Sequence, residues 1–195
     1  IKSSAASDVY KRQGIYTNML RHEDIDFFFA AHNIDNLRGI FGEAKNVHYV
    51  RLHSTNNIVR LAVEYPLIIT RLGVDYAHFQ YISPLIKTCK EIVTIHDLLF
   101  LDYPEYFPRS YRVKNEILFK LSAKRADLLL TVSKYSKDEI IRHFNICEDK
   151  IHITPNGVLP QNMGKALPDI KKKFGLYRYI LTVSRIAVSY THLRA

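Results

Sequence analysis

The sequence predicts an α/β fold, a Rossmann-like and largely parallel sheet with helices on both faces. Segments typical of strands alternate with segments typical of helices along most of the 195 residues. The run D-L-L-L-T-V at residues 127–132 is almost continuously apolar, as expected for a strand buried on both faces. Because ligands bind beyond the carboxyl ends of parallel strands, residues that directly follow strands are the first candidates for a site.

Short runs rich in β-branched and aromatic residues predict the strands. They lie at residues 26–31, 47–52, 75–80, 91–95, 127–132 and 151–154. A further strand at 179–183 is expected to open a second domain, after a linker with a short helix candidate.

Helices are predicted between these strands. Residues 54–73 begin with Ser54 or Asn56 as a cap and stop at Gly73, and Pro66 should kink this helix or end its first part. Ser133 can cap the helix that follows the strand at 127–132. A long helix is predicted at 109–125, and its side facing the core is expected to carry Val113, Ile117, Leu118, Leu121 and Ala123.

Composition limits the class of protein. The chain is 47% hydrophobic and 12% aromatic, which is typical of a globular protein. Its two cysteines, Cys89 and Cys147, lack zinc-site spacing and fit a reducing compartment. The net charge of +9 favours an acidic partner, such as a phosphorylated ligand or an anionic membrane. No basic cluster interleaved with aromatic residues is present, so a nucleic-acid partner is not expected.

Both ends of the chain differ from the pattern beside them. Residues 7–13 (S-D-V-Y-K-R-Q) and 188–195 (V-S-Y-T-H-L-R-A) resemble translated sequencing-adaptor sequence. We expect 1–13 and 188–195 to be non-native tails, and 1–13 not to pair within the sheet. The alternative is that both are genuine flexible termini.

A His-Asp pair ends the strand at 91–95, within E-I-V-T-I-H-D-L-L-F. His96 and Asp97 therefore stand where a cleft residue of a parallel sheet should be. A structural histidine, satisfied by Asp97 or a backbone carbonyl, is the alternative. Metal-dependent phosphohydrolases also use a His-Asp pair, but they place it on helices with further ligands, whereas this pair follows a β-branched strand.

Four motifs in order resemble the retaining GT-B glycosyltransferases of family four. They are T-I-H-D-L at 94–98 with P-E-Y-F at 104–107, A-K-R-A-D-L-L-L-T-V-S-K-Y-S-K at 123–137, K-I-H-I-T-P-N-G-V at 150–158, and F-G-L-Y-R-Y-I-L-T-V-S-R-I at 174–186. The similarity covers roughly residues 14 to 186.

The resemblance implies two Rossmann-like domains that face a cleft. Residues 14–158 would form the acceptor-binding domain without its first strand, and 159–187 a linker and the first strand of the donor-binding domain. The full protein would transfer a sugar from a nucleotide-sugar to a glycan or lipid-linked acceptor with retention. No metal and no cofactor are expected. The protein would be cytoplasmic, with a candidate peripheral contact at the inner face of the membrane.

The resemblance also assigns roles to residues. His96 would reach the transferred sugar, and Asp97 would fix its imidazole or the adjacent turn. Gly14 and Arg185 would lie near the donor phosphates, although Ser184 stands where the family usually has glycine. The interdomain turn would be formed by Pro155, Asn156 and Gly157.

Plainer interpretations stay open beside these. Arg185 could be a solvated charge at a strand end, and 156–157 an ordinary turn. His78 could face the acceptor or pack inside the fold. The basic residues of the helix at 109–125 could be a solvated face or could lie on anionic lipid. As it stands, the chain could also be an inactive fragment or a sugar- or lipid-binding module, which an assay for turnover would discriminate.

Overall fold

The computed structural model describes residues 14–156, 170–175 and 177–178. Residues 14–19 are helical. The strands are β1 (Phe27–Ala31), β2 (Val47–Arg51), β3 (Tyr76–Gln80), β4 (Lys90–Thr94), β5 (Leu128–Thr131) and β6 (Ile151–Ile153). The α-helices that follow β1 are α2 (Ile34–Phe41), α3 (Asn57–Val59), α4 (Tyr65–Leu72), α5 (Leu99–Asp102), α6 (Arg109–Arg125), α7 (Lys134–Phe144) and α8 (Ile170–Phe174). Short turns of other helix types are η1 (Arg60–Glu64), η2 (Pro104–Tyr106) and η3 (Glu148–Lys150).

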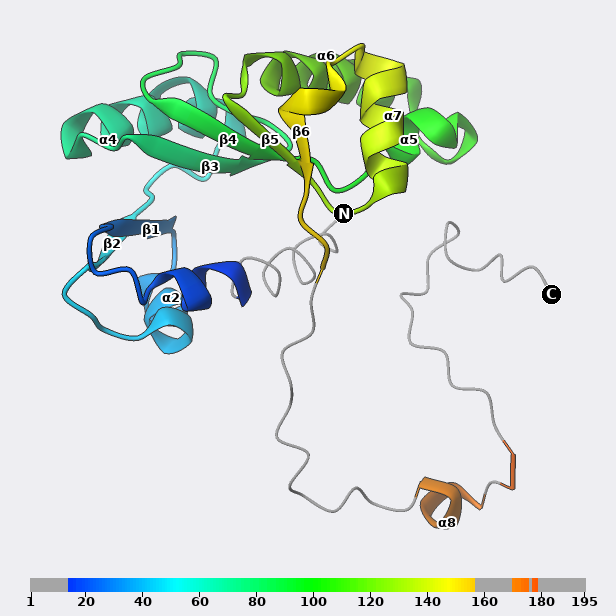
Figure 1. Cartoon of the computed structure of the whole chain (residues 1–195), viewed down its shortest axis with the longest axis horizontal. Helices are drawn as coiled ribbons and strands as arrows, with labels where there is room; N and C mark the ends of the chain where they lie inside the picture. The colour runs from blue at the N-terminus through cyan, green and yellow to red at the C-terminus, as the bar shows by residue number, and fades with distance from the viewer. Residues whose placement is uncertain (1–13, 157–169, 176, 179–195) are drawn as a thin grey trace.

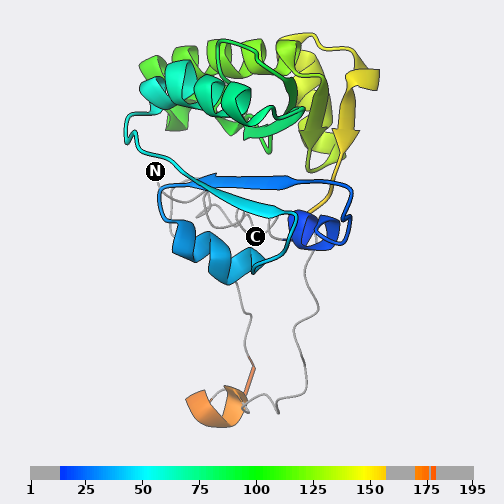
Figure 2. The same ribbon diagram turned by 90° about the vertical axis from the view of Figure 1, so that its left-hand side faces the viewer.

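All described strand pairs are parallel, so the predicted α/β class is confirmed. The strands form two sheets, β1-β2 and β3-β4-β5-β6. Helices α4, α6 and α7 lie on one side of the larger sheet, and the β1-α2-β2 unit lies on the other (Figures 1 and 2). Among the described residues no ladder joins β1 to β3. The expectation that residues 1–13 do not pair in the sheet falls outside the described residues.

The core lies between the four-stranded sheet and helices α6 and α7. Val93 of β4, Ile95 directly after it and Leu129 of β5 are fully buried, and Phe144 of α7 is fully buried beside them. The alternation of side chains along each strand sends these residues to one face. The opposite face of the same strands is then available for the polar residues described below.

Helix α6 has the predicted bounds, but three of the five residues predicted on its core-facing side face outward. Val113 is 49% exposed, Ile117 61% and Leu121 39%, whereas Phe119 is 7% exposed. Leu118 is half-buried and Ala123 is fully buried.

Aromatic packing and local hydrogen bonds explain this orientation. The Phe119 ring lies 4.9 Å from that of Tyr81 and 5.4 Å from that of Phe100. The buried polar side chains of the same face, Asn115 and Ser122, both donate to carbonyls of their own helix at 2.9 Å. Because these groups are satisfied, the helix can bury them and leave aliphatic residues outside.

The segment predicted as one helix at 54–73 is helical from Asn57 to Leu72, with a π-helical turn in its middle. Asn56 is its cap, since its Oδ1 accepts from the backbone N–H of Ile58 at 2.8 Å. The π-helical turn η1 precedes Pro66, which occupies the first turn of α4. The π-helical turn changes the hydrogen-bond pattern just before Pro66, where the backbone N–H is missing. Gly73 ends the helix with φ of +63°, in the left-handed region that favours glycine.

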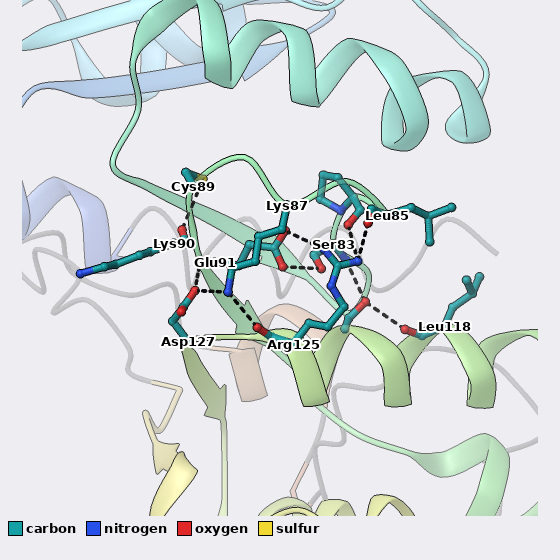
Figure 3. Close-up of polar contacts among 11 residues, drawn as sticks. Ser83, Leu85, Lys87, Cys89, Lys90, Glu91, Leu118, Arg125 and Asp127 are labelled. Atoms are coloured by element: carbon teal, nitrogen blue, oxygen red, sulfur yellow. Dashed lines mark hydrogen bonds and ion pairs between the residues drawn. The ribbon is translucent and has the colours of Figure 1, made fainter.

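A buried carboxylate fastens the loop after β3 to the end of α6 (Figure 3). Glu91 is 1% exposed, accepts from Ser83 Oγ at 2.9 Å, and lies 3.8 Å from Arg125 Nη2. Arg125 also donates to the carbonyls of Pro84 and Leu85, at 3.1 and 2.7 Å. These contacts fix residues 83–85 against α6.

Asp127 should make folding stability depend on acid pH. The hydrogen bond from Lys87, followed by that from the backbone N–H of Glu91, lowers the pKa of Asp127 below its ordinary value of 3.8. The carboxylate of Asp127 therefore binds a proton more readily in the unfolded chain than in the folded one. The stabilisation of the folded state by Asp127 is complete above about pH 4 and is lost as pH falls through the lowered folded pKa. We expect Asp127→Asn to cost at most about 1 kcal/mol at pH 7, because the pair is partly exposed.

Urea unfolding at pH 7 and pH 3 measures this effect. The difference in the free energy of unfolding between wild type and Asp127→Asn should be smaller at pH 3 than at pH 7. Asp149→Asn, which changes an exposed carboxylate, should show no such dependence on pH. A difference that stays constant or grows at pH 3 would contradict the assigned role.

Candidate active site

His96 lies at the carboxyl edge of the larger sheet, as the sequence predicted. It follows β4 by two residues, in the non-helical turn before α5. Its backbone carbonyl accepts from the buried Ser136 hydroxyl of α7 at 2.8 Å. Ser133 caps that helix as predicted, since its Oγ accepts from the backbone N–H of Ser136 at 3.1 Å. The first turn of α7 thus fixes the backbone position of His96.

The His96 imidazole is only 9% exposed, and its polar edge contacts another side chain. Nε2 lies 2.6 Å from Oε1 of Gln80, the last residue of β3. The imidazole also lies beside Tyr81, with ring centroids 5.5 Å apart. Since the amide oxygen of Gln80 can only accept, this contact makes His96 Nε2 the protonated nitrogen.

Gln80 also belongs to a network of polar side chains that extends away from His96. Nε2 of Gln80 lies 3.3 Å from Nε2 of His78, which also lies 2.7 Å from Thr94 Oγ1. The Tyr16 hydroxyl contacts Nδ1 of His78. If His78 Nδ1–H donates to Tyr16, His78 Nε2 is an acceptor, and both the Thr94 hydroxyl and the Gln80 amide donate toward it. The imidazole of His78, on β3, is thereby linked to that of His96, just after β4.

Strand register explains why these residues meet. Gln80 pairs with Thr94, and His78 with Ile92, so His78, Gln80 and Thr94 share one face. Continuing the same alternation past the end of β4 brings His96 to that side. Tyr16 comes from the helical segment 14–19.

Asp97 contacts the turn that follows it. Its Oδ1 accepts from the backbone N–H of Leu99 at 3.3 Å, at the start of α5. This contact lies on the adjacent turn, which was one of the two roles expected for Asp97. The role at the imidazole stays a prediction. Burial raises the pKa of Tyr111, and the negative charge of Asp97 adds to the effect.

The other predicted site residues are not part of this network of polar side chains, or they lie outside the described residues. Gly14 precedes Tyr16 in the helical segment, and its carbonyl accepts from Asn18 Nδ2 at 2.8 Å. Pro155 and Asn156 are exposed and follow β6. Gly157 and Arg185 lie outside the described residues, as does the strand predicted at 179–183.

Asp102, Glu139 and His143 form a cluster with the chemical types of a metal site. One potential ligand atom from each lies within 4.8 Å of the others. His143 Nε2 is 3.0 Å from Asp102 Oδ1, and Arg142 Nη2 lies 2.8 Å from the same oxygen. Arg142 also contacts Glu139. The guanidinium supplies the positive charge that the carboxylates need, so the cluster is an ion-pair network joining α5 to α7.

Sequence reasoning missed Gln80, Thr94 and Tyr16, and weighed His78 only as a packed or acceptor-facing residue. Gln80 and Thr94 do occupy the ends of their strands, which was a usable signal. Tyr16 carried no such signal, because its contact depends on how a helical segment lies against the sheet.

The fold defines a Rossmann-like α/β domain, with candidate site residues where its parallel strands end. The sequence profile described as Glycosyltransferase Family 4 matches residues 17–161. The chain therefore belongs to glycosyltransferase family 4.

Two curated proteins are similar over parts of the chain. The O-antigen chain mannosyltransferase B of Escherichia coli is 31% identical over 106 residues, which is 50% of this chain and 28% of that protein. The O-antigen chain mannosyltransferase RfbU of Salmonella typhimurium strain LT2 is 35% identical over 75 residues, 38% of this chain and 20% of that protein. The matched part of the chain thus spans about a quarter of these relatives. Within the described residues, no helix has the length and apolarity needed to cross a bilayer.

Proposed function

We propose that the full-length protein carrying this sequence is a retaining glycosyltransferase that uses a nucleotide-sugar donor and a glycan or lipid-linked acceptor. The family match over residues 17–161 is the observation that carries this proposal. Both similar proteins are named as O-antigen chain mannosyltransferases, so a nucleotide-activated mannose is the first donor to test.

The proposed role of His96 is to position the transferred sugar. Its Nε2–H, now directed at Gln80 Oε1, would donate to a sugar hydroxyl when the ring turns toward the donor. Gln80 would hold the imidazole in the tautomer that can donate, and Ser136 would hold the backbone beneath it. Once turned, this N–H would stabilise charge that develops near the transferred sugar in the transition state.

The remaining assignments rest on the family resemblance. Gly14 and Arg185 would contact the donor diphosphate, and the turn at 155–157 would join the two domains. The departing diphosphate needs positive partners, which basic side chains and backbone amides supply. We propose that this charge is met without a metal ion.

Proton NMR of the first-formed product tests the proposed reaction. The full-length protein, supplied with a nucleotide-activated mannose and a glycan acceptor, should form a glycosidic bond with the anomeric configuration of the donor. Testing other nucleotide-sugars in parallel separates a wrong choice of sugar from a wrong reaction. An inverted product would overturn retention, and no transfer from any donor to any acceptor would overturn the proposed activity.

A further inference from the structure

A strained backbone conformation lies directly beside the candidate site. Tyr81, the residue after β3, has a φ of +62°. Within the described residues, the other non-glycine residue with positive φ is Asn145, which ends α7 as a left-handed cap. Asparagine tolerates this conformation at a helix end, whereas a bulky aromatic residue rarely adopts it. The surroundings of Tyr81 must therefore maintain a conformation that its own side chain disfavours.

Backbone hydrogen bonds on both sides of Tyr81 hold this conformation. The N–H of Tyr81 donates to the carbonyl of Thr94 at 2.9 Å, which extends the contact between β3 and β4 by one residue. The N–H of Ile82 donates to the carbonyl of Gln80 at 2.7 Å and so closes a γ-turn around Tyr81. A γ-turn whose central residue has positive φ is rare and strained.

The chain that leaves this turn is fixed to helix α6. The backbone N–H of Ser83 donates to Ser122 Oγ at 3.0 Å, and Arg125 donates to the carbonyl of Leu85 at 2.7 Å (Figure 3). The γ-turn is thus held by the sheet on one side and by α6 on the other. A segment that is fixed at both ends can keep a strained residue that a free loop would relax.

The turn decides which side chain lies against His96. In an extended strand, Tyr81 would point to the face opposite Gln80 and therefore away from His96. With the observed turn, its ring centroid lies 5.5 Å from that of His96 and 4.9 Å from that of Phe119. One aromatic ring thus links the imidazole to the buried side of α6. The polar edge of the same imidazole is held by Gln80, whose Oε1 lies 2.6 Å from Nε2.

We propose that Tyr81 is a positioning residue for His96, and that its strained backbone is retained because it places the Tyr81 ring against the imidazole. The hydrogen bond to Gln80 fixes one atom of the imidazole, and the neighbouring ring restricts the tilt of the imidazole plane. Restricting a reacting group in this way favours the productive geometry. The consequence for catalysis rests on the function proposed for His96, whereas the contact between the two rings does not.

The Nε2–H proton of His96 reports on this contact in the purified 195-residue chain. Because this N–H is hydrogen-bonded and the ring is 9% exposed, its proton NMR resonance should be protected from exchange with water, and its loss in His96→Ala identifies it. Tyr81→Gly removes the ring, and the turn should persist because glycine adopts positive φ readily. We expect this variant to raise the exchange rate of the His96 Nε2–H at least about tenfold. Tyr81→Asn, which also tolerates positive φ, should act in the same way.

Two further variants show whether the effect belongs to the ring. Tyr81→Phe keeps an aromatic ring at the same place, so the exchange rate of the His96 Nε2–H should stay within about twofold of wild type. Ile151→Val removes a methyl group from a residue on β6 that is 2% exposed, which lowers stability without changing the contact. Its exchange rate should also stay within about twofold of wild type, which separates a local effect from a general loss of stability.

Sugar transfer by the full-length protein separates a positioning role from a merely structural one. Tyr81→Gly should lower kcat about tenfold and leave the KM for the donor within about twofold of wild type, because a misplaced imidazole impairs the reacting geometry. In the His96→Ala protein, the same substitution should change kcat by less than about twofold, since no imidazole is left to position.

Three results would overturn the proposal. One is a His96 Nε2–H that exchanges freely in the wild type, and another is a Tyr81→Gly variant in which this proton stays as protected as in the wild type. The third is a loss of kcat on Tyr81→Gly that is equally large with and without the His96 imidazole. The exchange measurements need no sugar transfer, so the positioning contact can fail while the proposed activity holds. If no donor supports transfer, the proposed activity fails, and the exchange rates still decide whether Tyr81 orients His96.

Discussion

In the full-length protein, His96→Ala is expected to lower kcat for sugar transfer by about 10²–10³-fold, the usual effect of removing one positioned hydrogen-bond donor. The imidazole stands at the carboxyl end of β4, and its Nε2–H is set by Gln80 at 2.6 Å. Alanine removes the donor and leaves the backbone contact from Ser136 to residue 96 in place. The loss should therefore lie mainly in kcat, measured under saturating donor and acceptor.

His152→Ala is the matched control for this prediction. His152 lies on β6 and is exposed, so the same substitution there removes an imidazole but leaves the network of polar side chains around Gln80 unchanged. We expect its kcat to stay within about twofold of wild type. Circular dichroism and the unfolding midpoint must show that His96→Ala is folded. Transfer that survives in a folded His96→Ala protein at close to the wild-type rate would contradict the role proposed for His96.

Phe119→Ala is expected to lower the free energy of unfolding by about 3–5 kcal/mol, as is typical of large aromatic deletions in a core. The ring is 7% exposed and packs against Phe100 and Tyr81. Its removal leaves a cavity between α6 and the sheet, and the neighbouring rings can fill it only in part. Urea unfolding of the purified chain at pH 7 measures the change.

Ile117→Ala provides the control, two residues away on the same helix. Ile117 is 61% exposed, so its truncation should change the free energy of unfolding by no more than about 0.5 kcal/mol. The pair of variants also decides which face of α6 is the inner one. If Ile117→Ala were the more destabilising variant, the helix would face the core as the sequence pattern had predicted, and the structural assignment would be wrong.

Strand positions were predictable because they depend on short-range patterns. The strand predicted at 127–132 is β5, and those at 26–31 and 47–52 are β1 and β2, each within one or two residues. Ser133 and Gly73 were also assigned correctly, since capping is local chemistry between residues close in sequence. Helix α2 was not predicted, although Asn33 is its cap.

The candidate site was predictable only in part. A residue directly after a buried strand could be recognised as lying at the sheet edge, and this located His96. Its hydrogen-bond partner could not be recognised, because Gln80 is sixteen positions away and meets it only through the parallel register of β3 and β4. Asp97, adjacent in sequence, was one of the expected partners, and its Oδ1 accepts from the backbone N–H of Leu99.

The sequence by itself determined the α/β class, the positions of the strands, the bounds of α6 and the place of His96 at a strand end. These follow from backbone propensity and from the period of apolar residues, which act over a few neighbouring positions. Only the tertiary structure decided which side of α6 faces the sheet and which side chain orients His96. Both depend on how surfaces distant in sequence fit together: Phe119 packs against the rings of Tyr81 and Phe100, and the register of β3 and β4 brings Gln80 to His96.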